Sequence, residues 1–133
     1  MTYQELENLR YLKKEIKHLE RKFEEASDDM GALRSPELSG LPSSPSLLGQ
    51  PVREAERLDE IRSVYEKQLK VYAAELLKAE RYIAEIKDSY TRLVFSLRFI
   101  DGFSWVKVAM TIGGNNTPDG ARMIVRRYLE KHS

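Results

Sequence analysis

Residues 104–131, SWVKVAMTIGGNNTPDGARMIVRRYLEK, predict two short helices joined by a glycine-containing turn. Ser104 is placed to cap the first helix, because its side-chain oxygen can accept a hydrogen bond from an exposed N–H group. Ala109 and Gly113 supply the small residue that lets two helices touch and the glycine that lets the chain turn. The side chains expected to face inward from the first helix are Trp105, Val108, Ala109 and Ile112.

The second helix of the pair has one apolar face and one charged face. Thr117 is its expected cap, and Pro118 is its expected first residue, where the missing N–H of proline costs nothing. The caps, the turn and the two faces are together typical of a helix-turn-helix. The expected inner face consists of Ala121, Ile124, Val125 and Tyr128, and the expected outer face of Asp119, Arg122, Met123, Arg126 and Arg127.

A third short helix is expected to precede this pair and to complete a C-terminal unit of residues 88–133. Asp88 and Ser89 form a common helix-start signal, so we expect the chain to bend or break there. Gly102 can take the left-handed conformation that closes a helix. We expect the segment from about Lys87 to Ser133 to fold by itself, with Trp105 as its main anchor, because its three helices supply their own apolar faces. The side chains expected to form these faces are Leu93, Leu97, Trp105, Val108, Ile112, Ile124 and Tyr128.

Positive charge is concentrated in the same C-terminal unit. The whole chain has a formal net charge of only +1. Residues 88–133 carry 7 Lys and Arg against 4 Asp and Glu, whereas residues 1–87 carry 15 against 17. A local excess of this kind suits a surface that binds nucleic acid.

The rest of the chain predicts two long helices separated by a linker. Residues 1–26 and 52–87 have helical spacing, and residues 27–51 contain four of the five prolines. Both helices carry an apolar seam at intervals of three and four residues, the pattern of a coiled coil. The seam residues are Leu9, Leu12, Ile16, Leu19 and Phe23 in the first helix, Leu58, Ile61, Tyr65, Leu69, Tyr72, Leu76, Ala79, Ile83 and Ile86 in the second, and the spacing continues through Tyr90, Leu93, Leu97 and Ile100.

The sequence allows two arrangements of the apolar seams. The helices can fold back as an antiparallel hairpin within one chain, or they can pair between two copies in a homodimer.

Thr2 and Glu5 have the spacing of a capping box and mark the start of the first helix. The predicted fold class is therefore all-α, with long N-terminal coiled-coil helices and a C-terminal helix-turn-helix.

Composition argues against several classes of function. The chain has no cysteine, and His18 and His132 lie at opposite ends of the sequence, so we expect no metal site, no disulfide and no cofactor. No apolar run approaches the roughly 20 residues that a membrane span needs. There is no phosphate-binding glycine motif and no paired-histidine motif. We therefore expect a non-enzymatic protein of the cytoplasm, without membrane contact.

The charged face of the last helix is suited to the major groove of double-stranded DNA. Arginine can bond bidentately to guanine, and its charge also neutralises phosphates. Arg122 and Arg126 are four residues apart and share one row, with Arg127 to its side. Near the helix start, the side chains of Asn115, Asn116 and Thr117 can contact a phosphate or a base edge, although asparagine is equally a good turn residue.

The stretch from Leu97 to Trp105, with Val108-Ala109 and Ile112-Gly113, resembles the promoter-reading C-terminal domain of sigma factors. It resembles still more the sigma-like domain of small phage and prophage regulators of the ArpU and RinA type. The resemblance covers about residues 88–131. It implies a regulator that binds promoter DNA and RNA polymerase, drives late-gene transcription and acts at the nucleoid of a bacterial host.

Two other functions remain open from sequence. The chain can be a phage DNA-packaging accessory protein, similar to a small terminase, that binds DNA within a larger oligomer. It can also be a coiled-coil adaptor that binds RNA polymerase without contacting DNA. The number of copies in the oligomer separates the first from a regulator, and DNA binding by the purified chain separates the second.

Overall fold

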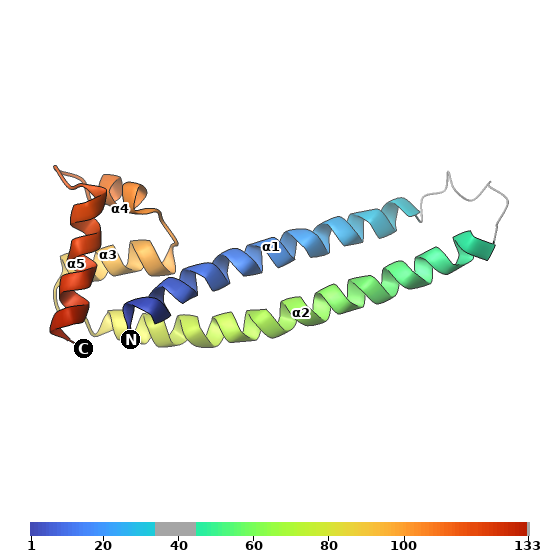
Figure 1. Cartoon of the computed structure of the whole chain (residues 1–133), viewed down its shortest axis with the longest axis horizontal. Helices are drawn as coiled ribbons and strands as arrows, with labels where there is room; N and C mark the ends of the chain where they lie inside the picture. Colours follow the sequence, from blue (N-terminus) through green and yellow to red (C-terminus); the bar gives the residue numbers. More distant parts are fainter. Residues whose placement is uncertain (34–44, 133) are drawn as a thin grey trace. The chain divides into compact units, whose positions relative to one another are not determined.

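The structure is a computed structural model that describes residues 1–33 and 45–132, and the regular elements in these ranges are all helical (Figure 1). This confirms the predicted all-α fold class. The elements are α1 (Tyr3–Leu33), α2 (Pro45–Ala84), α3 (Ser89–Phe95), the π-helical turn η2 (Ser96–Ile100), α4 (Trp105–Ile112) and α5 (Pro118–Lys131).

The two long helices extend further into the expected linker than the sequence predicted. The start of α1 is as predicted: the N–H of Thr2 donates to Glu5 Oε2 at 3.0 Å, and the N–H of Glu5 donates to Thr2 Oγ1 at 3.2 Å. However, α1 does not end near residue 26 but continues to Leu33. A single glycine such as Gly31 costs a helix only about 1 kcal/mol, so it does not stop one.

At the other end of the expected linker, α2 begins at Pro45 rather than near Val52. Proline fits the first turn of a helix because its N–H would have no intrahelical partner there. Of the segment 27–51, therefore, both flanks are helical, and the remaining residues 34–44 lie outside the described part of the chain.

The break expected near Asp88 and Ser89 is confirmed. After α2 ends, Asp88 caps α3: its Oδ2 accepts hydrogen bonds from the N–H of Thr91 at 3.1 Å and from Thr91 Oγ1 at 2.7 Å. These hydrogen bonds from Thr91 hold the pKa of the Asp88 carboxyl below its ordinary value. The cap marks the start of α3.

After the break, the buried side chains no longer follow the seam spacing of α2. Tyr90 and Leu93, predicted to continue the apolar seam, are 40% and 45% exposed, whereas Val94 and Phe95 are fully buried. The prediction that Leu93 faces the core is therefore wrong. The spacing rule assumed one continuous helix, and it fails where the helix axis changes.

The chain divides into two compact units. Unit 1 consists of Met1–Lys14 and Val71–Ser133, and unit 2 of Glu15–Lys70. The compact unit that contains the three C-terminal helices is thus larger than residues 88–133. Its core draws on α1, α2, α3, η2, α4 and α5, through buried Leu6, Leu9, Ala79, Ile83, Ile86, Val94, Phe95, Leu97, Phe99, Val108, Ala121, Val125 and Leu129.

Unit 2 contains the remaining parts of α1 and α2. Ile16 and Ala26 are its buried apolar side chains among those described, and Arg62 of α2 stacks over the ring of Phe23 at 5.4 Å. Leu69, predicted as a seam residue, is 39% exposed. The other predicted seam residues of this unit are half-buried: Leu19, Phe23, Leu58, Ile61 and Tyr65. The apolar sides of both helices are as predicted, and coiled-coil geometry stays a prediction.

Candidate nucleic-acid interface

Two side-chain caps and two glycines define the segment from α4 to α5. Ser104 Oγ accepts a hydrogen bond from the N–H of Lys107 at 3.2 Å, and Thr117 Oγ1 accepts one from the N–H of Gly120 at 2.9 Å. Both predicted caps are confirmed. Between the helices, Gly113 and Gly114 have φ values of 74° and 68°, a region that favours glycine. Each of these caps joins residues three positions apart, so the sequence was sufficient to predict them.

The inner faces of the two helices pack as the sequence indicated. Val108 and Ala109 are buried in α4, and Ala121 and Val125 are buried in α5. The other predicted inward residues are half-buried and pack against the same core: Trp105, Ile112, Ile124 and Tyr128. Trp105 is thus a contributor at the edge of the core rather than its centre, which Phe95 and Phe99 occupy.

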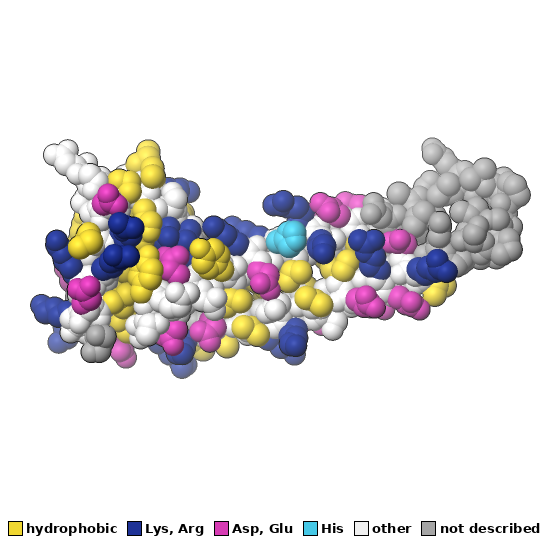
Figure 2. Space-filling view, in the orientation of Figure 1, with side chains coloured by type: hydrophobic (Ala, Val, Ile, Leu, Met, Phe, Trp, Pro, Cys, Tyr) yellow, Lys and Arg dark blue, Asp and Glu magenta, His cyan; other side chains and the backbone are white. Residues whose placement is uncertain are grey.

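The outer face of α5 carries the predicted contact residues. Asp119, Arg126 and Arg127 are exposed, Met123 is 39% exposed and Arg122 is partly exposed. In the space-filling view, Lys and Arg side chains gather over α5 among apolar ones (Figure 2). The sequence therefore assigned the two sides of this helix correctly.

The predicted residues before α5 lie in the exposed connection from α4. Asn115 and Asn116 are both exposed. Asn116 Nδ2 donates to the carbonyl oxygen of Gly113 at 2.6 Å, so this side chain stabilises the turn. Thr117 is occupied as the cap of α5. Of these three side chains, only that of Asn115 makes no hydrogen bond within the described residues.

Arg122 is held by a neighbour on its own helix. Its Nη2 lies 3.3 Å from Asp119 Oδ1, in a pair whose carboxylate is 87% exposed. An exposed pair of this kind contributes little to stability. The Nε of Arg122 is buried and has no hydrogen-bond partner in the described part of the chain. The guanidinium group can therefore leave Asp119 at little cost when a better acceptor approaches.

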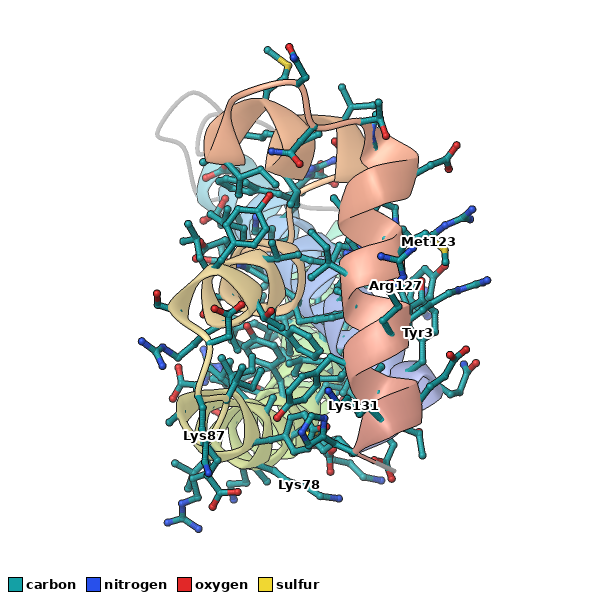
Figure 3. All side chains as sticks on the ribbon, turned by 90° about the vertical axis from the view of Figure 1, so that its left-hand side faces the viewer. Tyr3, Lys78, Lys87, Met123, Arg127 and Lys131 are labelled. Atoms are coloured by element: carbon teal, nitrogen blue, oxygen red, sulfur yellow. The ribbon has the colours of Figure 1, made fainter. Side chains whose placement is uncertain are left out.

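Arg126 lies beside the N-terminus of the chain. Its guanidinium carbon is 5.9 Å from the centre of the Tyr3 ring, and the Tyr3 ring packs edge-on against Phe99 at 6.4 Å. Figure 3 shows Tyr3 beside α5. Burial raises the pKa of the Tyr3 hydroxyl and the Glu7 carboxylate raises it further, whereas Arg98 and Arg126 lower it. The start of α1 thus contacts the outer face of α5.

A buried ion pair joins the same part of α1 to η2. Arg98, in the π-helical turn, lies 3.0 Å from Glu7 Oε1 through its Nη2, and both side chains are largely buried. The Nη1 of Arg98 donates to the carbonyl oxygen of Phe103 at 3.0 Å, and its guanidinium stacks over Trp105 at 4.3 Å. Arg98 therefore connects α1, η2 and the start of α4.

This ion pair was not predicted from the sequence. A signal was present, because Arg98 stands between Leu97 and Phe99 in an apolar stretch and an inward-facing arginine needs an acidic partner. Nothing in the sequence shows that the partner is Glu7, 91 positions away.

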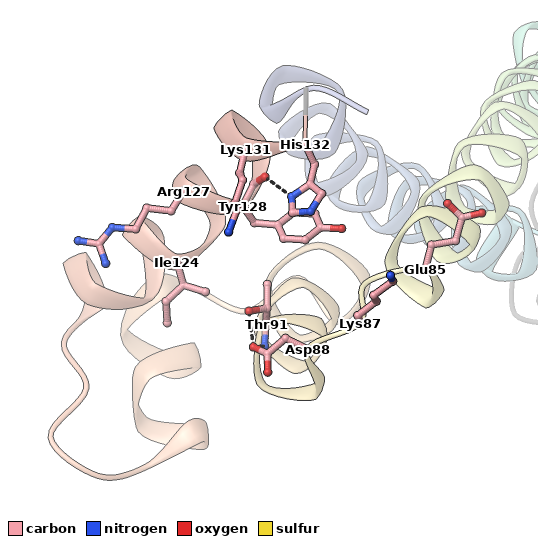
Figure 4. Close-up of a pocket in the computed structure, with 9 residues that line it drawn as sticks. All are labelled: Glu85, Lys87, Asp88, Thr91, Ile124, Arg127, Tyr128, Lys131 and His132. Atoms are coloured by element: carbon pink, nitrogen blue, oxygen red, sulfur yellow. Dashed lines mark hydrogen bonds between the residues drawn. The ribbon is translucent and has the colours of Figure 1, made fainter.

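A groove of about 570 Å³ runs between α5 and the connection from α2 to α3 (Figure 4). We call it the α5 groove. Ile124, Arg127, Tyr128, Lys131 and His132 line it from α5 and its end, and Glu85, Lys87, Asp88 and Thr91 line it from the other side. The rings of Tyr128 and His132 stack with centroids 4.1 Å apart. Of these residues, only Arg127 was a predicted contact.

The described residues hold no group of three or more histidine, cysteine or acidic side chains placed to bind a metal ion. Within the same residues, no helix is long and apolar enough to cross a membrane. The chemistry that the site offers consists of guanidinium and ammonium groups, amides and backbone N–H groups. These groups bind anions and base edges.

No protein-family model matches the chain, and no curated protein or solved structure matches it either.

Proposed function

We propose that this chain is a sequence-specific regulator of transcription that binds double-stranded DNA through a sigma-like helix-turn-helix formed by α4 and α5. The observation that carries the proposal is the division of α5 into two faces. Ala121 and Val125 are buried, while Arg126 and Arg127 are exposed on the other side. A helix supported along its back with guanidinium groups at its front has the form that a major groove accepts.

The contacts follow from the chemistry of the outer face. Arg122 and Arg126 can each bond bidentately to the O6 and N7 atoms of guanine, or neutralise a phosphate. The N-terminal end of α5, with Asn115 near it, presents N–H groups that suit a phosphate oxygen. Met123 lies between the arginines in sequence and offers apolar contact to a thymine methyl group. The proposal needs no catalytic residue and no cofactor.

The resemblance of residues 88–131 to phage and prophage regulators of the ArpU and RinA type supports a narrower form of the proposal. In that form the chain activates late genes in the cytoplasm of a bacterial host and contacts RNA polymerase as well as promoter DNA. A homodimer would place two recognition helices on adjacent half-sites.

The test is a binding assay of the purified chain against fragments of the encoding genome, followed by footprinting. We expect an arginine that bonds a guanine edge to lose about 1 to 3 kcal/mol of specific binding when replaced by alanine, with relaxed preference at one base pair. The test variant is Arg122→Ala with Arg126→Ala. The matched control is Lys67→Ala with Lys70→Ala, which removes equal charge from exposed positions of unit 2.

Equal binding of the genomic site by the parent and by the arginine double variant at near-physiological salt would remove α5 as the reading element. A uniform loss on all sequences, with a salt dependence reduced by about one unit per arginine, would instead assign the two arginines to phosphates.

A second candidate is an adaptor that binds RNA polymerase without contacting DNA. It is favoured by two apolar side chains on the outer face of α4, Val106 at 57% and Met110 at 76% exposed. Exposed apolar pairs of this kind suit contact with a protein. If the parent chain binds no fragment of the genome but co-purifies with RNA polymerase, and Met110→Lys abolishes this, the adaptor function replaces the regulator. A ring of many copies in solution would favour the packaging accessory.

A further inference from the structure

The α5 groove brings together three cationic side chains from two parts of the chain. Lys87 comes from the connection between α2 and α3, and Arg127 and Lys131 are one turn apart on α5 (Figures 3 and 4). All three are exposed, and none of them forms a salt bridge within the described residues. Their charges are therefore available to a ligand.

Two acidic residues also line the groove, and the structure gives one of them another role. The Asp88 carboxylate accepts hydrogen bonds from the N–H and the hydroxyl of Thr91, as the cap of α3. The cap directs this carboxylate at Thr91 within its own helix. Glu85 makes no salt bridge in the described part of the chain, so three cations face two carboxylates. This excess of positive charge favours an anion in the groove.

The floor of the groove is apolar. Ile124 and the ring of Tyr128 lie between the cations of α5 and the residues of the α2–α3 connection. An anion bound there would have a carbon-rich neighbour that packs on this floor. A sugar joined to a phosphate meets both requirements, because it places an apolar ring edge beside a diffuse negative charge.

We propose that the α5 groove is a phosphate site for the backbone of bound DNA, with Lys87 and Lys131 as contact residues. This inference rests on the proposed function, because it assumes that α5 lies in a major groove. It adds a contact 31 residues before α5 in sequence, at Lys87, to the surface that reads the DNA.

The α5 groove is continuous with the outer face of α5, and this supports DNA as the source of the phosphate. Arg127 belongs to both surfaces: it lies beside the row of Arg122 and Arg126 on the outer face, and it also lines the groove. A helix in the major groove has the sugar-phosphate backbones along its sides, and about half or more of protein–DNA hydrogen bonds go to them. Lys131 and Lys87 would then hold one strand and fix the register in which α5 meets the bases.

The test is the salt dependence of DNA binding by the full chain with Lys87→Gln and Lys131→Gln. The slope of log K against log salt changes by about 0.9 for each phosphate contact, so we expect it to fall by about two units. The fall should be the same on the genomic site and on unrelated duplex, with an unchanged footprint. The control with Lys67→Gln and Lys70→Gln removes the same charge from unit 2 and should leave the slope close to that of the parent.

Lysine-to-arginine replacements at positions 87 and 131 should keep the slope, because they keep both charges. Circular dichroism checks that each variant retains the helix content of the parent, which we expect since both lysines are exposed. A slope that falls only as far as in the unit 2 control, while the parent binds DNA, would overturn the phosphate site and leave the proposed function standing.

A titration with inorganic phosphate distinguishes DNA from a free anion. If phosphate shifts the ring signals of His132 and Tyr128 at sub-millimolar concentration, and the lysine double variant loses this shift while its DNA salt slope is unchanged, the groove binds a free phosphorylated ligand and the assignment to DNA is wrong. If the parent binds no DNA under any salt condition, the proposed function itself fails.

Discussion

Unit 1 and unit 2 share the same two long helices, but they bury their apolar side chains to very different extents. In unit 1, Leu6, Val94, Phe95, Val108 and Val125 are completely buried. In unit 2, the most buried described apolar side chains are Ile16 and Ala26, at 8% exposure. Two helices alone cover each other along one line, whereas unit 1 adds α3, α4 and α5 as a second layer over that line. The core of unit 1 therefore forms where α1 and α2 pack against the C-terminal helices.

The largest effect is expected when the C-terminal helices are separated from the rest of unit 1. Their own sequence predicts that residues 87–133 fold alone, but Leu6, Leu9 and Ala79 line the same core in the structure. We therefore expect the fragment 87–133 to lose its cooperative thermal transition, measured by circular dichroism and by Trp105 fluorescence.

The control for this fragment is a shortened chain that keeps the whole core of unit 1. In this chain, residues 15–70 are replaced by a short Gly/Ser linker. We expect this chain to unfold cooperatively. If the fragment 87–133 unfolds as sharply as the shortened chain, the N-terminal residues are not needed for the core.

The next effect concerns a single side chain in each unit. Phe95→Ala should lower the free energy of unfolding by about 3 to 5 kcal/mol, because the ring is fully buried among other aromatic rings. Leu58→Ala in unit 2 removes a half-buried side chain and should cost about 1 kcal/mol. Urea unfolding followed by circular dichroism measures both. Equal losses would mean that unit 2 is packed as tightly as unit 1.

A smaller effect is expected from the ion pair that ties α1 to η2. Glu7→Gln removes the charge that faces both Arg98 and Arg10 in a largely buried site. It should cost about 3 kcal/mol, at the lower end for broken buried pairs, because Arg98 keeps its hydrogen bond to the carbonyl of Phe103. Glu15→Gln, an exposed acid of unit 2, is the control and should change the free energy of unfolding by less than about 0.5 kcal/mol. A neutral result for Glu7→Gln would show that the pair adds nothing to the fold.

The smallest effect is a loss of stability in alkali. Burial raises the pKa of Tyr3, Tyr72 and Tyr82, with Glu7, Glu80 and Tyr128 as the respective further causes. The folded state therefore holds these phenolic protons more tightly than the unfolded state does. The resulting stabilisation is present below about pH 10 and is lost as the pH rises through the raised values.

Tyr82→Phe tests this pH dependence, because the variant lacks one of the three protons. Between pH 9 and pH 11, its free energy of unfolding should fall less steeply than that of the parent. Parallel curves would show that lysine deprotonation or another group controls alkaline unfolding.

Local rules predicted much of the fold and part of the candidate site. The caps by Asp88, Ser104 and Thr117 follow from hydrogen bonds that span three residues, so they can be read from the sequence. The exposed side of α5, with Arg126 and Arg127, follows from its helical period. The helical period holds only within one unbroken helix. It therefore failed for Leu93, which lies beyond the break between α2 and α3.

The tertiary structure alone decided which distant residues meet. By itself, the sequence determined an all-helical chain, its caps and turn glycines, and the two faces of α5, because these depend on interactions within about one turn of helix. Packing decided that Glu7 neutralises Arg98, that Tyr3 lies against Arg126, and that Lys87 and Lys131 line one groove. Such pairings depend on the angles at which helices cross, which are set by the shapes of many side chains at once and leave no spacing rule in the sequence.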